Sequence, residues 1–200
     1  GMGMDRRIGS NFLKAGIGYG GSCFPKDTKA LNFQSDHAGV KLKTVKATID
    51  VNREQRTRLI DKARRFFPTF RDVRVAIIGL TFKPGTDDLR EAPAKQNIDI
   101  LLNEGADIIA WDPLGVENFR KRYPNCAINF AKDIDEALTD ADVCLIMTEW
   151  EKIVEYPLDN YKKYMKRPLV FDGRNCYKLS EAEKHEIFYD SIGRKIVDTL

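Results

Sequence analysis

The sequence has no long hydrophobic run and few of the residues that build metal centres. No apolar stretch approaches the roughly 20 residues that a membrane-spanning helix needs, and residues 1–7 lack the apolar core of a signal peptide. Only two histidines are present, and the four cysteines are scattered without a CxxC pair. These absences argue against a membrane protein and a zinc site, and they predict a reduced, cytoplasmic protein without a bound metal.

A strong excess of one charge is also missing. The 33 basic and 30 acidic side chains give a formal net charge of +3, which is too small to predict a nucleic-acid partner. The short basic clusters at 41–46 and 162–167 are typical of solvated helix faces. A content of 42% hydrophobic and 32% charged residues is ordinary for a globular protein, and 200 residues suit one large or two small domains.

From about residue 70 onward, short apolar runs alternate with amphipathic stretches. The run VRVAIIGL at 73–80 is rich in β-branched residues, as in a strand buried on both faces of a parallel sheet. The same reasoning predicts strands at 106–113, 128–130, 142–147 and 168–174, and helices at 92–103, 116–122 and 134–138. This alternation is typical of βαβ units. It predicts an α/β fold with a Rossmann-like doubly wound parallel sheet over 70–200.

Residues 1–69 have a different pattern, that of a glycine-rich loop followed by helices. One helix is predicted to begin at Pro25 or Asp27, because proline suits the first helical turn and an acid suits the positive helix start. A second helix is predicted over 43–67, and Pro68 terminates it. We therefore place a domain boundary near residue 70.

The loops at the carboxyl ends of the predicted strands are the expected ligand site of such a sheet. The first of them reads GLTFKPGTDDLR at 79–90 rather than GxGxxG, so the dinucleotide fingerprint is absent there. Lys83 and Arg90 instead place two cations in this loop, which suit a phosphate-bearing ligand or are simply solvated. Asp112, after the second strand, favours a turn-forming Asp-Pro pair over a ribose contact.

A single cysteine, Cys23, ends the glycine-rich loop in the stretch GIGYGGSCFPKD at 16–27. A nearby cation and a helix N-terminus favour the thiolate form of a cysteine, and Lys26 and the predicted helix supply both. The upstream glycines leave backbone N–H groups free to hold an anion, and Asp27 is placed to orient a water or take a proton. Two interpretations stay open at this point, a covalent thiol nucleophile and a cysteine that packs in the core.

Three longer motifs are similar to those of a known family. DRRIGSNFLKAGIGYGGSCFPKDTKAL at 5–31, GLTFKPGTDDLREAPA at 79–94 and VFDGRN at 170–175 resemble the UDP-glucose/GDP-mannose dehydrogenase family, and the resemblance covers essentially the whole chain. Members have an NAD-binding Rossmann domain, a central helical region and a C-terminal Rossmann-like domain that binds UDP. The resemblance implies that 1–69 is the last part of the central region, that 70–200 is the UDP-binding domain, and that the NAD-binding domain is missing.

In this family the C6 alcohol of a nucleotide sugar is oxidised to a carboxylate with two NAD+ in succession. The resemblance implies that Cys23 is the nucleophile, through a thiohemiacetal and a thioester, and that Asp27 assists the hydrolytic water. It implies NAD contacts for Lys26 and Arg90. The substrate contacts that it implies are Arg7, which reaches the site of a neighbouring subunit, and Phe12, Leu13, Lys14, Ala15, Gly16, Gly20, Lys83 and Arg174.

The resemblance also implies an assembly and a substrate. The predicted 43–67 helix matches a long central helix that forms a dimer core, so a homodimer is expected. The variant GYGGSCFPKD favours UDP-glucose, with GDP-mannose and UDP-N-acetylmannosamine as alternatives. Without an NAD-binding domain the chain alone is expected to be inactive. The competing prediction is a nucleotide-sugar-binding, dimer-forming module with no catalysis of its own.

Overall fold

The computed structural model describes residues 1–11 and 13–199 and places a six-stranded parallel sheet at the centre of the fold. The strand order β3-β2-β1-β4-β5-β6 reverses next to β1, as in doubly wound Rossmann-like folds. The strands are β1 (Arg74–Ile78), β2 (Asp107–Trp111), β3 (Asn129–Phe130), β4 (Val143–Ile146), β5 (Leu169–Asp172) and β6 (Phe188–Ser191). The predicted α/β class and Rossmann-like parallel sheet are therefore confirmed.

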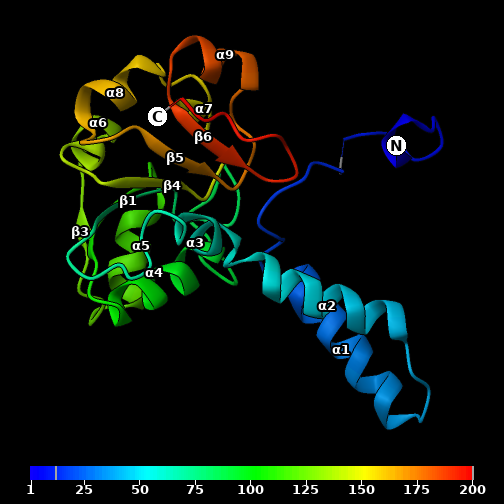
Figure 1. The fold of residues 1–200 in the computed structure, drawn as a ribbon. Helices are drawn as coiled ribbons and strands as arrows, with labels where there is room; N and C mark the ends of the chain where they lie inside the picture. Colours follow the sequence, from blue (N-terminus) through cyan, green and yellow to red (C-terminus); the bar gives the residue numbers. More distant parts are fainter. Residues whose placement is uncertain (12, 200) are drawn as a thin grey trace.

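Helices cover both faces of this sheet (Figure 1). One face carries α3 (Arg58–Ala63), α4 (Pro93–Asn103) and α5 (Gly115–Arg122), and the other carries α6 (Ile134–Leu138), α8 (Asp159–Tyr164) and α9 (Leu179–Lys184), with the short α7 (Glu151–Val154) after β4. The helices predicted between the strands match α4, α5 and α6 to within a residue at each end.

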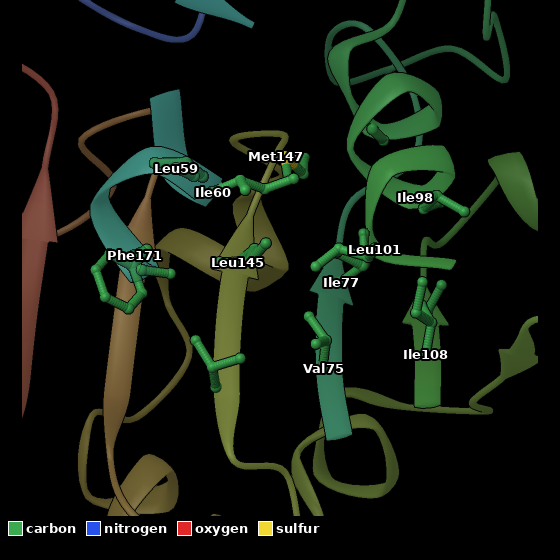
Figure 2. Packing of buried hydrophobic residues seen from close by; sticks show 14 of the residues in the cluster. Leu59, Ile60, Val75, Ile77, Ile98, Leu101, Ile108, Leu145, Met147 and Phe171 are labelled. Carbon is green, nitrogen blue, oxygen red and sulfur yellow. The ribbon is translucent and has the colours of Figure 1, made fainter. Parts of the chain in front are cut away.

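Alternate side chains of each strand pack into two separate apolar clusters. Val75 and Ile77 of β1 pack with Leu59 of α3 and Leu101 of α4 (Figure 2). Ala76, between them in the chain, belongs to the cluster under α6 and α8. Successive strand residues point to opposite faces, so a strand covered on both sides is apolar at every position. That requirement explains the unbroken apolar runs by which the sequence predicted these strands.

A helical hairpin projects away from the sheet (Figure 1). It consists of α1 (Cys23–His37) and α2 (Lys43–Gln55), which pack against each other, and the single-turn 3₁₀ helix η1 (Met2–Met4) lies near the N-terminus. The following helix, α3, leaves the hairpin and buries Leu59, Ile60 and Ala63 against the sheet. The hairpin and the sheet domain are thus joined through a short bend between α2 and α3.

Two helix boundaries differ from the predictions. α1 begins at Cys23, so Pro25 occupies its first turn, where a missing N–H group breaks no helical hydrogen bond. The helix predicted over 43–67 is interrupted at Arg56 and Thr57, and its second part, α3, ends at Ala63 rather than at residue 67. There the Arg56 carbonyl accepts a hydrogen bond from the side-chain amide of Asn97 on α4 (2.8 Å), a partner that local pattern cannot reveal.

The last strand, the helices α7, α8 and α9, and the 3₁₀ helix η1 were not predicted. β6 reads FYDS, in which an acid interrupts the apolar run. That acid, Asp190, is buried and pairs with Lys62 of α3 at 2.6 Å. Tyr189 of β6 forms an antiparallel bridge with Val197, which lies beyond the strand. The ion pair with Lys62, which is distant in sequence, therefore offsets the cost of burying a charged residue in this edge strand.

Candidate active site

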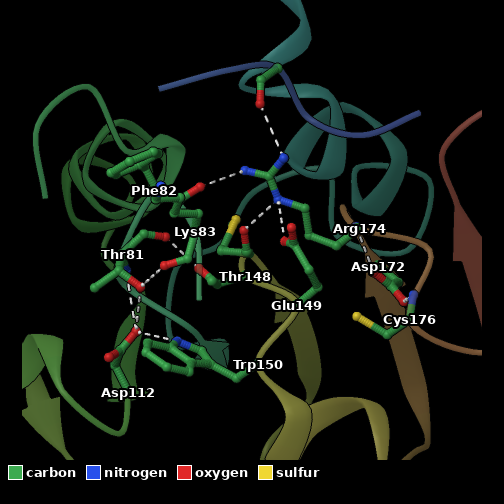
Figure 3. A network of polar contacts seen from close by, with 12 residues as sticks. Thr81, Phe82, Lys83, Asp112, Thr148, Glu149, Trp150, Asp172, Arg174 and Cys176 are labelled. Atoms are coloured by element: carbon green, nitrogen blue, oxygen red, sulfur yellow. Dashed lines mark hydrogen bonds and ion pairs between the residues drawn. The ribbon is translucent and has the colours of Figure 1, made fainter. Parts of the chain in front are cut away.

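The loops that follow β1, β4 and β5 meet at one edge of the sheet, beside the reversal of strand order (Figure 3). They comprise residues 79–92, 147–150 and 173–176. Ligands of doubly wound sheets bind at this position. The geometry therefore gathers polar side chains from three separate segments where the sequence predicted a site.

The glycine-rich loop lies across this edge. The Ile17 N–H donates to the Gly173 carbonyl (3.0 Å), and the Gly21 N–H donates to the Arg90 carbonyl (2.8 Å). The approach is so close that a Cβ on Gly20 would lie 2.5 Å from the carbonyl oxygen of the residue after Arg90. Gly21 has a φ of +82°, where side chains are rare. The loop conformation therefore requires glycine at both positions.

The opposite side of the loop is held by α2. The Tyr19 N–H donates to Asn52 Oδ1 (2.8 Å), and Asn52 Nδ2 donates back to the Tyr19 carbonyl (3.2 Å). Gln55 Nε2 donates to the Gly16 carbonyl (3.1 Å). The sequence analysis did not select Asn52 or Gln55, because two polar residues on a helix carry no signal of the loop that they bind.

Cys23 stands at the first position of α1, where the loop ends, and its side chain is exposed. The Ser22 hydroxyl lies 3.7 Å from its Sγ. The loop that ends at Cys23 bonds to the Arg90 carbonyl through Gly21. Hydrogen bonds to Asp88 raise the pKa of the Arg90 guanidinium, and the charge of Cys23 in its thiolate form adds to that rise. This arrangement rules out the interpretation of Cys23 as a core residue of the described chain.

The other three thiols are in different surroundings. Burial raises the pKa of Cys126 and raises that of Cys144, inside β4, well above its ordinary value. Burial also raises the pKa of Cys176, and nearby Asp172 and Glu149 add to the rise. Thiolate is the reactive form, so these three positions disfavour it.

Two further predicted residues lie on the first turns of α1. Lys26 Nζ and Asp27 Oδ1 form an ion pair at 3.3 Å, and both side chains are exposed. Exposed ion pairs contribute little to stability. Both residues therefore stay near Cys23 because they share its helix rather than because of this ion pair, and both are accessible from solvent.

Lys83 and Arg174 lie on the sheet edge in contrasting environments. Lys83 is exposed, with its Nζ 5.3 Å from the centre of the Phe82 ring. Arg174 is largely buried, and burial lowers the pKa of its guanidinium. Its Nε and Nη atoms donate to carbonyls of Met147 (3.0 Å) and Gly18 (3.1 Å) (Figure 3).

The contacts of Asp112 are those of a turn-forming residue rather than those of a ribose-binding one. Its Oδ2 accepts from the Leu80 N–H (2.7 Å) and from Trp150 Nε1 (3.1 Å), and its Oδ1 accepts from the Leu114 and Gly115 N–H groups (2.9 and 2.6 Å). This carboxylate is engaged on both oxygens and is 4% exposed. With no glycine fingerprint beside it, this sheet edge does not fit a dinucleotide.

Glu91 ties the hairpin to the sheet edge and was not selected from the sequence. Its carboxylate pairs with Lys29 of α1 (2.9 Å) and with Arg56 (2.7 Å). The hydrogen bond from Lys29 is the main cause that holds the pKa of Glu91 below its ordinary value, and Arg56 acts in the same direction. Its φ of +54° marks a constrained backbone. Only the folded chain brings these three residues together.

The remaining predicted substrate contacts are not gathered at the edge to the same extent. Gly16 and Gly20 lie in the docked loop, whereas Leu13, Lys14 and Ala15 are exposed ahead of it. Arg7 is exposed and pairs with Asp5 at 2.8 Å, in an N-terminal segment that lies away from the sheet (Figure 1). Phe12 lies outside the described residues. Within residues 1–11 and 13–199, no three metal-ligating side chains cluster, and no helix is long and apolar enough to cross a membrane.

The fold and the site define a Rossmann-like α/β protein with an exposed cysteine on a glycine-rich loop across the strand-order reversal. Comparison with family models identifies it further. The UDP binding domain of the UDP-glucose/GDP-mannose dehydrogenase family matches residues 76–179, and the central domain of the same family matches residues 1–54. The chain belongs to the UDP-glucose/GDP-mannose dehydrogenase family.

Several curated relatives cover nearly the whole chain. UDP-glucose 6-dehydrogenase YwqF of Bacillus subtilis is 45% identical over 197 residues, which are 98% of this chain and 44% of the relative. The UDP-glucose 6-dehydrogenase of Rhizobium meliloti is 42% identical over 97% of this chain and 44% of its own length. The chain thus spans less than half the length of these relatives.

Solved structures share the fold. A UDP-glucose dehydrogenase from Pyrobaculum islandicum superposes with a TM-score of 0.81 at 29% identity, covering 94% of this chain and 41% of that one. A GDP-mannose dehydrogenase from Pseudomonas aeruginosa superposes with a TM-score of 0.70 at 25% identity, covering 84% and 39%. The same architecture therefore occurs in dehydrogenases named for different nucleotide sugars.

Proposed function

We propose that this chain is the UDP-sugar-binding, nucleophile-bearing part of a UDP-glucose 6-dehydrogenase that works in the cytoplasm. One observation carries the proposal: Cys23, an exposed thiol at the start of α1, is anchored beside Arg90 by a glycine-rich loop that lies on the strand-order reversal. The relatives above, named UDP-glucose 6-dehydrogenases, support UDP-glucose as the substrate. Lys83 supplies a cation for the diphosphate at the same edge.

The chemistry that suits this cysteine is a two-stage oxidation of the C6 alcohol. Loss of a hydride and a proton converts the alcohol to an aldehyde. The Cys23 thiolate adds to the aldehyde carbon, forming a C–S bond, and loss of a second hydride from that carbon yields a thioester. Water then attacks the carbonyl carbon, the C–S bond breaks, and the products are UDP-glucuronate and free thiolate. A serine would form a less labile ester.

Asp27 and the exposed cations beside Cys23 have distinct roles in this proposal. Asp27, four residues along α1, assists the hydrolytic water. Lys26 and Arg90 would contact NAD, which would supply the hydride acceptor when bound. Because the sheet edge of this chain does not fit a dinucleotide, NAD is held by a dinucleotide-binding domain that this chain does not contain. We therefore expect the chain alone to be inactive.

The sugar nucleotide is placed by the segments that converge on the sheet edge. Gly16 and Gly20 belong to the docked loop and are proposed to contact the sugar nucleotide through their backbone, and Arg174 donates to the Gly18 carbonyl of the same loop. Leu13, Lys14 and Ala15 are exposed ahead of the loop, and we propose that they contact the substrate together with Phe12. Arg7 is exposed and pairs with Asp5, and we propose that it reaches the substrate of a neighbouring subunit.

We also propose that the hairpin forms a homodimer. Leu31, Phe33 and Val51 of the hairpin are 46%, 72% and 61% exposed. An open apolar depression of about 370 Å³ lies between the glycine-rich loop and α2, with Val51 in its wall. Burial of such apolar surface favours association, and a second copy of the chain presents the same hairpin in a self-complementary way.

The decisive experiment joins the chain to the NAD-binding segment of a relative and follows NADH production from UDP-glucose. We expect activity in the joined protein, none in the chain alone, and a loss of at least roughly 100-fold in Cys23→Ser, because removal of a covalent nucleophile is among the costliest changes in an enzyme. Cys126→Ser is the matched control and should keep its activity.

Two outcomes would change the assignment. Full activity of Cys23→Ser would overturn the nucleophile role. Turnover of GDP-mannose or UDP-N-acetylmannosamine in preference to UDP-glucose would reassign the substrate, and binding of UDP-glucose without turnover in the joined protein would leave a nucleotide-sugar-binding module.

A further inference from the structure

A buried carboxylate stands directly behind the proposed site. Asp172, at the carboxyl end of β5, is fully buried, and within the described chain no cation pairs with it directly. It accepts hydrogen bonds from the backbone N–H groups of Arg174 (2.6 Å) and Cys176 (2.7 Å) and from the Tyr189 hydroxyl (2.6 Å). A buried carboxylate is costly unless it is well satisfied, so its partners here are strongly specified.

A cation reaches this carboxylate through the phenol of Tyr189. The Tyr189 hydroxyl donates to Asp172 and accepts from Arg194 Nη2 (2.8 Å). Arg194 is held by its other N–H groups, which donate to the Tyr177 carbonyl (2.9 Å) and the Ser191 hydroxyl (2.9 Å). Arg194, Tyr189 and Asp172 therefore form a continuous chain of hydrogen bonds that ends on the backbone of the 173–176 loop.

The far side of the same loop is fixed as well. Asn175 adopts a left-handed conformation with φ of +58°. Its side-chain amide donates to the Ile192 carbonyl (3.1 Å) and accepts from the Ile192 N–H (3.0 Å). The loop is thus bound to Asp172 through Arg174 and Cys176, and to Ile192, just after β6, through Asn175, so the backbone that carries the Arg174 side chain is fixed.

The Arg174 side chain points into the candidate site. Arg174 is 12% exposed, and its guanidinium bonds to the segments that hold Gly18, Phe82 and Met147, with a contact to Glu149 at 3.3 Å (Figure 3). Gly18 belongs to the glycine-rich loop that ends at Cys23. The guanidinium therefore links the loop of the cysteine to the sheet edge, together with the backbone hydrogen bonds of Ile17 and Gly21.

We propose that Asp172, Tyr189 and Arg194 form a positioning relay that fixes Arg174, and that through Arg174 the relay holds the glycine-rich loop and Cys23 on the sheet edge. Asp172 does not face the ligand; it acts through the backbone of the loop that carries Arg174. The proposed coupling concerns the fold of this chain. Its consequence for catalysis rests on the proposed function.

The test uses Tyr189→Phe, which removes the hydroxyl and keeps the ring that packs on Tyr177. Its matched control is Asp190→Asn, on the same strand: Asp190 is buried, and it pairs with Lys62 rather than with the 173–176 loop. Hydrogen–deuterium exchange is measured on residues 16–21 of the intact chain, with exchange in β1 and β4 as the report of global stability.

We expect Tyr189→Phe to speed exchange of residues 16–21 by roughly tenfold relative to β1 and β4, the scale of one hydrogen bond to a charged group. Asp190→Asn should change the exchange of the strands without this selective loosening. Equal loosening of 16–21 in both variants, or none in Tyr189→Phe, would overturn the relay.

A double-mutant cycle tests whether the relay acts through Arg174. Arg174→Lys should loosen residues 16–21 by itself, because lysine lacks the planar fork of N–H groups. If Tyr189 acts through Arg174, adding Tyr189→Phe to Arg174→Lys should produce little further change, whereas additive effects would contradict the relay. The exchange assay needs neither UDP-glucose nor NAD, so its failure is distinguishable from failure of the dehydrogenase proposal.

Discussion

The sheet domain and the α1–α2 hairpin bury their apolar residues to very different degrees. Strands β4, β5 and β6 are buried at every position, and the helices on both faces complete two apolar clusters. In the hairpin, by contrast, the buried residues are Pro25, Ser35 and Asn52, and Phe33 is 72% exposed. The difference teaches that the sheet domain has an apolar core of its own, whereas the hairpin leaves large apolar side chains exposed, as the proposed homodimer requires.

The largest expected effect comes from a pair of large-to-small substitutions, one in the sheet domain and one in the hairpin. Leu145→Ala in β4 should cost about 2 to 5 kcal/mol in the free energy of unfolding, because Leu145 is fully buried between helices. Phe33→Ala on α1 should change the stability of the monomer by less than about 0.5 kcal/mol. Urea denaturation at low protein concentration measures both, and a similar loss in the two variants would refute the contrast.

The reactivities of the four thiols provide a second test of the difference in burial between the sheet domain and the hairpin. Cys23 of the hairpin should be alkylated fastest at neutral pH, and Cys144 of β4 at least roughly 100-fold more slowly, because burial raises its pKa and blocks access. Cys176 should resemble Cys144, with Cys126 between them. Peptide mass after timed alkylation checks the order. Equal rates for Cys23 and Cys126 would argue against a specially presented thiol.

The smallest expected effect concerns the carboxylate that joins the two regions. The folded-state pKa of Glu91 is lowered, so its ion pairs stabilise the docked hairpin above the unfolded pKa of about 4.3 and are lost as pH falls through the folded value. Exchange in α1 should therefore rise modestly below about pH 4.

Glu91→Gln should remove this acid-dependent rise. Glu104, whose pKa is lowered chiefly by its hydrogen bond with Arg64, lies at the end of α4 and is the matched acid in the sheet domain. Glu104→Gln should leave the pH dependence of α1 unchanged. A pH response of α1 that persists in Glu91→Gln would place the titrating group elsewhere.

Much of the sheet domain was predictable because its signals are local. The apolar runs located β1 to β5, since burial on both faces leaves its mark on consecutive residues, and the amphipathic stretches located α4, α5 and α6. β6 was not predicted because Asp190 interrupts the apolar run, and the burial of this acid depends on its ion pair with Lys62. The break between α2 and α3 escaped because its hydrogen-bond partner is Asn97.

The candidate site divides in the same way. Cys23 and the cations Lys83 and Arg90 drew attention from the residue types and their spacing alone. The residues that hold them were invisible, because Asn52 and Glu91 act on partners far away in the chain. The resemblance implied a substrate contact for Arg174, and the structure adds that its side chain is a largely buried link between three segments.

The sequence by itself determined the alternation of strands and helices, and it carried the motifs of the family. Both features depend on residues that are close together in the chain, so they can be recognised without knowledge of any tertiary contact. Tertiary structure alone decided which loop lies on which edge: the hydrogen bond from Arg174 to the Gly18 carbonyl joins residues 156 positions apart. Such contacts form only when the sheet has assembled, because the entropy of closing so long a loop is offset by the burial of the whole core.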